Sequence, residues 1–155
     1  MKLLTAPSFY KLLKDNFPHT PTSKQEVALQ QLAHFVLSEK KEEVYLLKGF
    51  AGTGKTTIVG DIVSNLWKTT MKAVLLAPTG RAAKVMSNYS KSQAFTIHRK
   101  IYFPKKESGG GIKFILAPNK HRDTIFIVDE ASMIPDSSSA VSRSIRKLIT
   151  PSRIG

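Results

Sequence analysis

The chain has 155 residues, which leaves room for one domain with a buried core. It has no cysteine, and this excludes disulfide frameworks and thiolate metal sites. Its 24 lysines and arginines outnumber 11 aspartates and glutamates, and the resulting net charge of +13 favours a polyanionic partner, most often a nucleic acid. No apolar run is long enough for a signal peptide or a membrane span, so we expect a cytoplasmic protein with no membrane partner.

Two helices are predicted before the first glycine-rich segment. Apolar residues at helical spacing predict a short amphipathic helix over 8–17, inside an N-terminal extension, 1–21, that ends in prolines. Thr22 and Gln25 then form a capping box, which opens a helix predicted to reach about residue 38. Gln25 has two interpretations. Its amide serves the cap alone, or it contacts adenine, because an amide offers a donor and an acceptor together.

A phosphate-binding loop is the strongest pattern in the chain. Residues 49–56 fit G-x-x-x-x-G-K-[ST], between an apolar run at 44–48 that predicts a strand and a segment with helical spacing. Its glycines let backbone N–H groups turn toward phosphate oxygens, at the positive end of the following helix. Lys55 can reach the β- and γ-phosphates, and the Thr56 hydroxyl can ligate Mg²⁺. The nucleotide-binding residues predicted here are Gly49, Ala51, Gly52, Thr53, Gly54, Lys55, Thr56 and Thr57.

A second strand and turn follow the loop. Residues 73–77 are a continuous apolar run, which predicts a buried parallel strand. Residues 78–81 then turn into a helix predicted over 82–86, and 87–95 is expected to be a loop. Thr79 and the N–H groups that open this helix can bind a backbone phosphate, or Thr79 is only a helix N-cap.

The next segment mixes basic and aromatic residues. Residues 96–103 offer charge and stacking surface for a single strand, and His98 is either part of that surface or a buried core residue. Residues 104–111 are expected to be flexible, and 112–116 is a candidate strand.

The last strong signal is a buried strand at 124–128 that ends in two carboxylates. Asp129 is expected to hold Mg²⁺, and Glu130 is expected to polarise the attacking water as general base. The alternative is an ordinary strand end with an acidic helix cap. Strands at 44–48, 73–77 and 124–128, separated by helical segments, predict an α/β fold with a parallel sheet and sites at the carboxyl ends of its strands.

Together these segments resemble one family. Gln25, residues 49–57, A-P-T-G-R-A-A at 77–83, Thr96-Ile97-His98 and V-D-E-A-S-M-I at 128–134 are similar to the Q motif and motifs I, Ia, Ib and II of superfamily 1 DNA helicases. The branch that they resemble is the RecD-like and phage Dda-like one, whose members couple ATP hydrolysis to 5′-to-3′ translocation. The resemblance implies a RecA-like P-loop NTPase domain over 22–134, with helices on both faces of its sheet, that binds ATP, Mg²⁺ and single-stranded DNA.

Carried over position by position, the resemblance assigns roles to single residues. Gln25 would contact adenine, Lys55 and Glu130 would be catalytic, and Thr56 and Asp129 would hold the metal. The implied DNA contacts are Pro78, Thr79, Arg81, Thr96 and His98.

The resemblance stops shortly after Ile134. Family members continue with a glycine-aspartate-glutamine motif, a second RecA-like domain and arginines that touch the γ-phosphate, whereas residues 135–155 form a tail rich in serine and arginine. We therefore expect an incomplete domain, truncated after motif II, with a poorly ordered tail. Because such an arginine is worth about 10³–10⁵ in rate, we expect almost no hydrolysis. If the second motor domain is supplied by another chain, that chain is a further possible partner.

Two other functions stay open from the sequence alone. A non-catalytic basic module would bind single strands with an affinity that falls steeply with salt and ignores nucleotide. A small-molecule kinase would need an acceptor-binding lid, and the sequence after Asp129 offers none.

Overall fold

The computed structural model describes residues 4–40 and 43–134. They form two compact units. The first takes its described residues from Met1–Ala73, Asn88–Ser92 and Asp123–Ile125, and the second takes them from Val74–Ser87, Gln93–Arg122 and Phe126–Gly155. The tail predicted at 135–155 lies outside the described residues.

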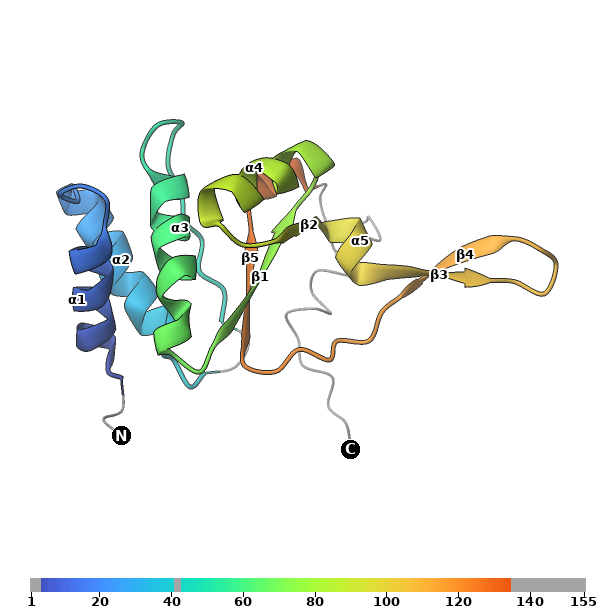
Figure 1. Ribbon diagram of the computed structural model, residues 1–155, viewed down its shortest axis with the longest axis horizontal. Coiled ribbons are helices and arrows are strands. Elements are labelled where there is room, and N and C mark those ends of the chain that lie inside the picture. The colour runs from blue at the N-terminus through green and yellow to red at the C-terminus, as the bar shows by residue number, and fades with distance from the viewer. Residues whose placement is uncertain (1–3, 41–42, 135–155) are drawn as a thin grey trace. The chain divides into compact units, whose positions relative to one another are not determined.

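Three helices build the first unit (Figure 1): α1 (Ala6–Asn16), α2 (Ser23–Val36) and α3 (Lys55–Asn65), the last extended by a short 3₁₀ helix, η1 (Leu66–Lys68). Phe9 and Leu13 stand one turn apart on α1 and are fully buried. They share a core with Leu29 of α2 and Ile58 of α3. The predicted N-terminal helix is therefore confirmed, and it packs directly on the helix that follows the phosphate loop.

The capping box at the start of α2 is confirmed. The Thr22 hydroxyl accepts a hydrogen bond from the Gln25 N–H at 3.3 Å, and the Gln25 amide oxygen accepts one from the Thr22 N–H at 2.9 Å. The helix ends at Val36, two residues before the predicted end.

The strand predicted at 44–48 was wrong, because these residues form neither strand nor helix. Their side chains do alternate as in a strand: Tyr45 and Leu47 are half-buried, whereas Val44 and Leu46 are 72% and 63% exposed. A β-strand also needs a neighbouring strand that satisfies its backbone N–H and C=O groups. None of the strands in the described part of the chain pairs with this segment.

A three-stranded sheet has the order β2-β1-β5, with β1 at Lys72–Ala77, β2 at Ala94–Thr96 and β5 at Thr124–Val128. On one side, Leu75 pairs with Ala94 and Ala77 with Thr96, which is parallel register. On the other side, the Lys72 N–H donates to the Asp123 carbonyl at 2.8 Å and the Asp129 N–H to the Leu76 carbonyl at 3.0 Å. Residue numbers rise in the same direction along both strands, from the Lys72–Asp123 bond to the Leu76–Asp129 bond, so β5 is also parallel to β1. The predicted α/β fold with a parallel sheet is confirmed.

Helices cover both faces of this sheet within the second unit. Leu76 packs with Ile97 and Ile101 of α5 (Ile97–Ile101). Ala77, which follows it and therefore points to the opposite face, packs with Ala82 of α4 (Gly80–Ser90). The prediction of helices on both faces is confirmed.

The loop predicted at 87–95 is confirmed only at 91–93, and the rest of the prediction was wrong. Helix α4 continues to Ser90, and Ala94–Thr96 forms β2. Serine and asparagine favour turns over helices in isolation, but Met86 and Ser90 are buried here. The Ser87 hydroxyl also accepts a hydrogen bond from the Ala94 N–H at 2.8 Å, which joins the helix to the strand. Tertiary packing thus overrides local preference.

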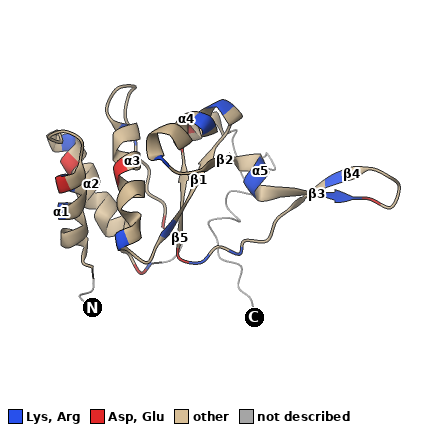
Figure 2. Ribbon diagram, in the orientation of Figure 1, with Lys and Arg blue, Asp and Glu red and all other residues tan. Residues whose placement is uncertain are grey.

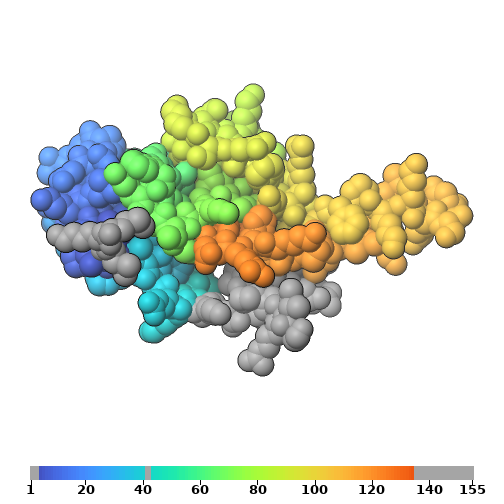
Figure 3. Space-filling model, turned by 60° about the horizontal axis from the view of Figure 1, so that its bottom comes forward, coloured from blue at the N-terminus to red at the C-terminus, as the bar shows by residue number. Residues whose placement is uncertain are grey.

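An antiparallel hairpin completes the second unit, with β3 at Tyr102–Lys106 and β4 at Ile112–Leu116. In the space-filling view it forms a narrow arm that leads away from α5 (Figure 3). The candidate strand at 112–116 is confirmed, whereas the flexible segment predicted from 104 was wrong in its first part. Pro104 lies in β3 opposite Phe114, and the turn begins only at Glu107, whose N–H donates to the Gly111 carbonyl at 2.8 Å.

Candidate nucleotide and nucleic-acid sites

The phosphate loop has the backbone that its glycines predict. Gly52 and Gly54 have φ angles of +76° and +85°, in the left-handed region that favours glycine. A side chain at Gly54 would also collide with the amide of Gln25. Helix α3 begins directly after this turn, and no side chain among the described residues caps it. Its first N–H groups are therefore available to an anion, which the helix dipole also favours.

Lys55 lies against the same loop. Its Nζ donates to the carbonyl oxygens of Gly49 at 2.5 Å and Phe50 at 2.7 Å. These two oxygens occupy the acceptor positions that phosphate oxygens would take from the ammonium group. The Phe50 carbonyl also accepts a hydrogen bond from the Thr53 hydroxyl at 2.8 Å, so the loop is closed on itself.

Gln25 joins the start of α2 to the phosphate loop. Its side chain is 8% exposed, and its Nε2 donates to the Thr53 carbonyl at 3.2 Å while its oxygen accepts from Thr22. The capping interpretation is therefore correct, and the side chain holds the loop as well. One amide hydrogen and one lone pair remain, so contact with adenine stays a prediction.

The two predicted carboxylates follow β5 in the second unit. Asp129 is half-buried, and its Oδ1 accepts a hydrogen bond from the Glu130 N–H at 2.8 Å. Glu130 is exposed and has a φ of +51°, a left-handed conformation that costs a non-glycine residue about 1 kcal/mol. The strand end thus presents the Glu130 side chain to solvent, before a 3₁₀ helix at Ala131–Met133.

The predicted magnesium ligands, Thr56 and Asp129, offer a hydroxyl and a carboxylate oxygen, which are hard donors suited to this ion. Thr56 belongs to the first unit and Asp129 to the second. Within 4–40 and 43–134, no group of three or more histidine, aspartate or glutamate residues could hold a metal ion without other donors. Two protein ligands, with water and phosphate oxygens completing the shell, are typical of magnesium bound with a nucleotide.

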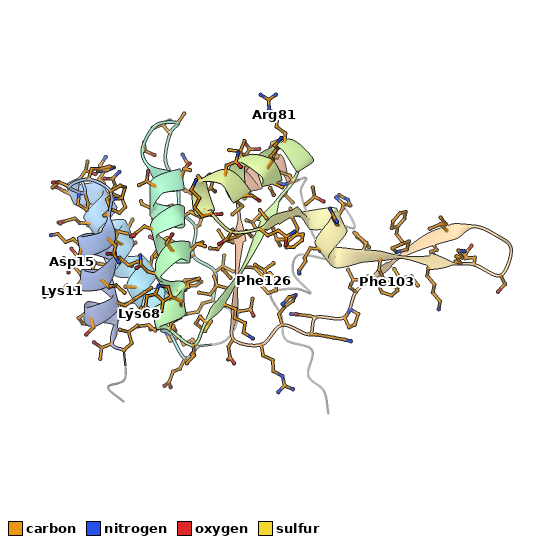
Figure 4. The ribbon with its side chains drawn as sticks, in the orientation of Figure 1. Lys11, Asp15, Lys68, Arg81, Phe103 and Phe126 are labelled. Carbon is orange, nitrogen blue, oxygen red and sulfur yellow. The ribbon has the colours of Figure 1, made fainter. Side chains whose placement is uncertain are left out.

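The residues predicted to contact DNA lie at or near the N-terminal ends of two helices of the second unit, α4 and α5. The Thr79 hydroxyl accepts from the Ala82 N–H at 3.2 Å, so its helix-cap interpretation is confirmed. Pro78 is half-buried before it, and Arg81 points away from α4 into solvent (Figure 4).

Thr96 and His98 lie at the second of these helices. Thr96 caps α5 through its hydroxyl, which accepts from the Arg99 N–H at 3.2 Å. His98 is exposed and stacks on Tyr102, with ring centroids 5.8 Å apart. The alternative that His98 is a core residue was therefore wrong.

The β3–β4 hairpin carries basic and aromatic side chains on both of its faces: Phe103 shares one face with Lys105 and Lys113, and Phe114 shares the other with Lys106. Lys105, Lys106 and Lys113 lie on its two strands (Figure 2), and Phe103 and Phe114 are 43% and 67% exposed. Lysines beside exposed aromatic rings are the combination that binds single-stranded nucleic acid. The sequence pattern that could have predicted this hairpin is the glycine-rich turn between two short strand-forming segments.

Residues 30–148, more than half of the chain, match the family model described as AAA domain. The chain belongs to the AAA domain family. With its phosphate loop, this makes it a P-loop nucleoside-triphosphatase domain, and its predicted fold class agrees with the family. Among the helices described, none is long and apolar enough to cross a membrane.

Two curated proteins are similar to parts of the chain. The ATP-dependent DNA helicase dda of Enterobacteria phage T4 is 33% identical over 109 residues, which are 63% of this chain and 23% of that protein. The uncharacterized protein MJ1519 of Methanocaldococcus jannaschii is 33% identical over 121 residues, which are 70% of this chain and 10% of that protein. The chain thus spans a quarter or less of the relatives' length. The family match and the similarity to the phage helicase support a helicase-like superfamily 1 relationship.

Proposed function

We propose that this chain is the first motor domain of an ATP-dependent DNA helicase of the RecD-like and Dda-like branch, which moves 5′ to 3′. The observation that carries the proposal is the phosphate loop. Its left-handed glycines, its lysine and the uncapped start of α3 form one anion site, held by Gln25. The similarity to the phage helicase adds support.

The loop is built to exchange one set of acceptors for another. In this structure Lys55 donates to two loop carbonyls, and a bound triphosphate would supply phosphate oxygens in their place. The N–H groups of Thr56 and Thr57, in the first turn of α3, would donate to the same phosphates. We propose Gly49, Ala51, Gly52, Thr53 and Gly54 as the backbone of this cradle.

We propose that hydrolysis uses the two carboxylates at the end of β5. Glu130, whose side chain is exposed, would accept a proton from the attacking water. Thr56 and Asp129 would hold Mg²⁺, which neutralises charge on the phosphate oxygens when it is bound.

We propose that single-stranded DNA binds along the second unit. The capped starts of α4 and α5 offer N–H groups and hydroxyls for backbone phosphates, at Thr79 and Thr96. Arg81 and His98 are exposed beside them, and His98 already stacks on an aromatic ring. The lysines and phenylalanines of the hairpin extend the same chemistry.

The test is a titration with a fluorescent ATP analogue. Lys55→Ala is expected to abolish binding, because it removes the ammonium group at the loop. Lys48→Ala, an exposed lysine shortly before the loop, is the matched control and should leave the affinity unchanged. Equal affinity in wild type and Lys55→Ala would refute the proposal.

A non-catalytic single-strand-binding module is the second candidate, and the basic, aromatic hairpin favours it. Such a module is expected to bind single-stranded DNA with an affinity that falls steeply with salt concentration but does not change when nucleotide is added. Fluorescence anisotropy of a labelled oligonucleotide, with and without ATP, separates the two functions.

A further inference from the structure

Asp61 lies on α3, the helix whose first turn forms the proposed phosphate site. It follows Thr56 by five residues, or about 7.5 Å along the helix axis. Thr56, Thr57 and Asp61 all line one open pocket beside α3. Among the described residues that line this pocket, Asp61 is the only charged one. A charge on its carboxylate would therefore act directly on an anion bound at the first turn.

The Asp61 carboxyl is closed off from water and short of hydrogen-bond donors. The residue is 7% exposed, and its Oδ1 accepts a hydrogen bond from the Asn65 Nδ2 at 3.0 Å. Asn65 is fixed in turn, because its Oδ1 accepts one from the Asn16 Nδ2 of α1 at 2.7 Å. The second carboxylate oxygen, Oδ2, is buried and has no hydrogen-bond partner among the described residues. Ionisation of this group is therefore costly, and a proton on Oδ2 removes the charge.

The elements packed around Asp61 bring no opposite charge to it. Helix α1 contributes Leu12 and Asn16 to the pocket, and its charged residues are exposed instead: Lys11, Lys14 and Asp15. The segment Asn88–Ser92, in the same unit, contributes Tyr89, which is the only other titratable side chain among the described lining residues.

The lysines of α3 and η1 are engaged elsewhere. The Lys55 Nζ donates to two carbonyl oxygens of the phosphate loop. The Lys68 Nζ lies over the Trp67 ring, 4.1 Å from its centroid. Burial consequently raises the pKa of Asp61 to about 7, and the hydrogen bond from Asn65 opposes the rise only in part. The carboxyl thus changes its charge close to neutral pH.

Resting on the proposed function, we propose that Asp61 links nucleotide binding to protons: the phosphate site binds a triphosphate tightly when this carboxyl is protonated and weakly when it is ionised. The physical cause is the repulsion between two negative charges on one helix. Linkage is reciprocal, so a bound triphosphate also favours the protonated carboxyl. Nucleotide binding by this chain then depends on pH around neutrality.

The expected size of the effect follows from the separation of the two charges. About 7.5 Å of helix, with the lateral distance to a bound phosphate, puts them roughly 10 Å apart. Two unit charges at that distance, in an effective dielectric constant of about 20, change an equilibrium by about tenfold. Because Asp61 becomes charged as pH rises through about 7, its contribution should weaken binding by this factor between pH 5.5 and 8.5.

The first test measures the affinity for inorganic triphosphate by isothermal titration calorimetry, without magnesium, at pH 5.5 and 8.5. The ratio of wild-type to Asp61→Asn affinity cancels the titration of the ligand and of other groups. We expect a ratio close to one at pH 5.5 and about one tenth at pH 8.5, because only the wild type gains the charge. Asp15→Asn, at an exposed carboxyl on α1 outside the pocket, is the matched control and should follow the wild type.

The second test needs no substitution in the core. Carbon-13 NMR of the aspartate carboxyl groups follows the protonation of Asp61 in the wild-type chain, with and without inorganic triphosphate. The midpoint of the Asp61 titration should rise by about one pH unit when the ligand is bound, which is the same tenfold factor. The exposed Asp15 should titrate at the same pH in both samples.

The inference is overturned if the wild-type and Asp61→Asn affinities stand in the same ratio at both pH values, or if the midpoint of Asp61 does not move. Binding that ignores the charge of Asp61 but is lost in Lys55→Ala overturns this inference alone and leaves the proposed function intact. A wild type that binds no triphosphate at either pH overturns the proposed function as well.

Discussion

Replacing Asp61 with asparagine should stabilise the folded chain at neutral and alkaline pH. Burial raises the pKa of this carboxyl from its ordinary 3.8 to about 7. Between these values the folded state holds a proton that the unfolded state has lost, so stability falls as pH rises from about 4 to 7. At about 1.36 kcal/mol per pH unit, the interval corresponds to about 4 kcal/mol. Asparagine has nearly the same shape and carries no charge, so the variant escapes this loss.

The measurement is urea unfolding of wild type and variant, followed by far-ultraviolet circular dichroism, at pH 4.5, 6 and 8. Because the unfolded carboxyl is already mostly ionised at pH 4.5, the variant should be more stable there by about 1 kcal/mol, and this difference should grow to about 4 kcal/mol at pH 8. Asp15→Asn, at an exposed site on α1, should show no such divergence. A difference that does not change with pH, or a less stable variant at pH 8, would refute the account of Asp61.

Three further changes test other parts of the structure. Phe9→Ala removes a fully buried ring that joins α1 to α3, and urea unfolding should show a loss of about 3–5 kcal/mol; an unchanged midpoint would mean that α1 is dispensable. Gly54→Ala forces a side chain into a left-handed turn and against Gln25, so it should cost more than about 1 kcal/mol and weaken ATP-analogue binding; normal binding would contradict this loop geometry. Phe103→Ala and Phe114→Ala should each weaken single-stranded DNA binding by about 1–3 kcal/mol in fluorescence anisotropy, with an unchanged salt slope, and no change would remove the hairpin from the DNA surface.

The segments with a local physical cause could be predicted from the sequence. The capping box at Thr22 and Gln25 depends on residues three apart, and both hydrogen bonds are present. The left-handed turn at Gly54 depends on the absence of a side chain. The strands β1 and β5 are continuous apolar runs in the sequence, and the carboxylates follow β5 directly, although β5 is half-buried along its length and not fully buried as predicted.

Elements that depend on distant partners could not be predicted in this way. The apolar run at 44–48 is not a strand because no described strand pairs with it. Helix α4 continues through unfavourable residues because Met86 and Ser90 are buried. Asp61 on α3 is 7% exposed, and this burial depends on tertiary packing and not on its neighbours in the sequence.

The sequence by itself therefore determined the phosphate loop, the strand ends with their carboxylates and the parallel α/β class, because each follows from neighbouring residues and backbone geometry. Only the tertiary structure decided that the first helix belongs to the core, that Gln25 supports the loop, and that Asp61 lacks a hydrogen-bond donor on one oxygen. Burial and unsatisfied polar atoms are properties of contacts between segments far apart in the chain, and no local pattern encodes them.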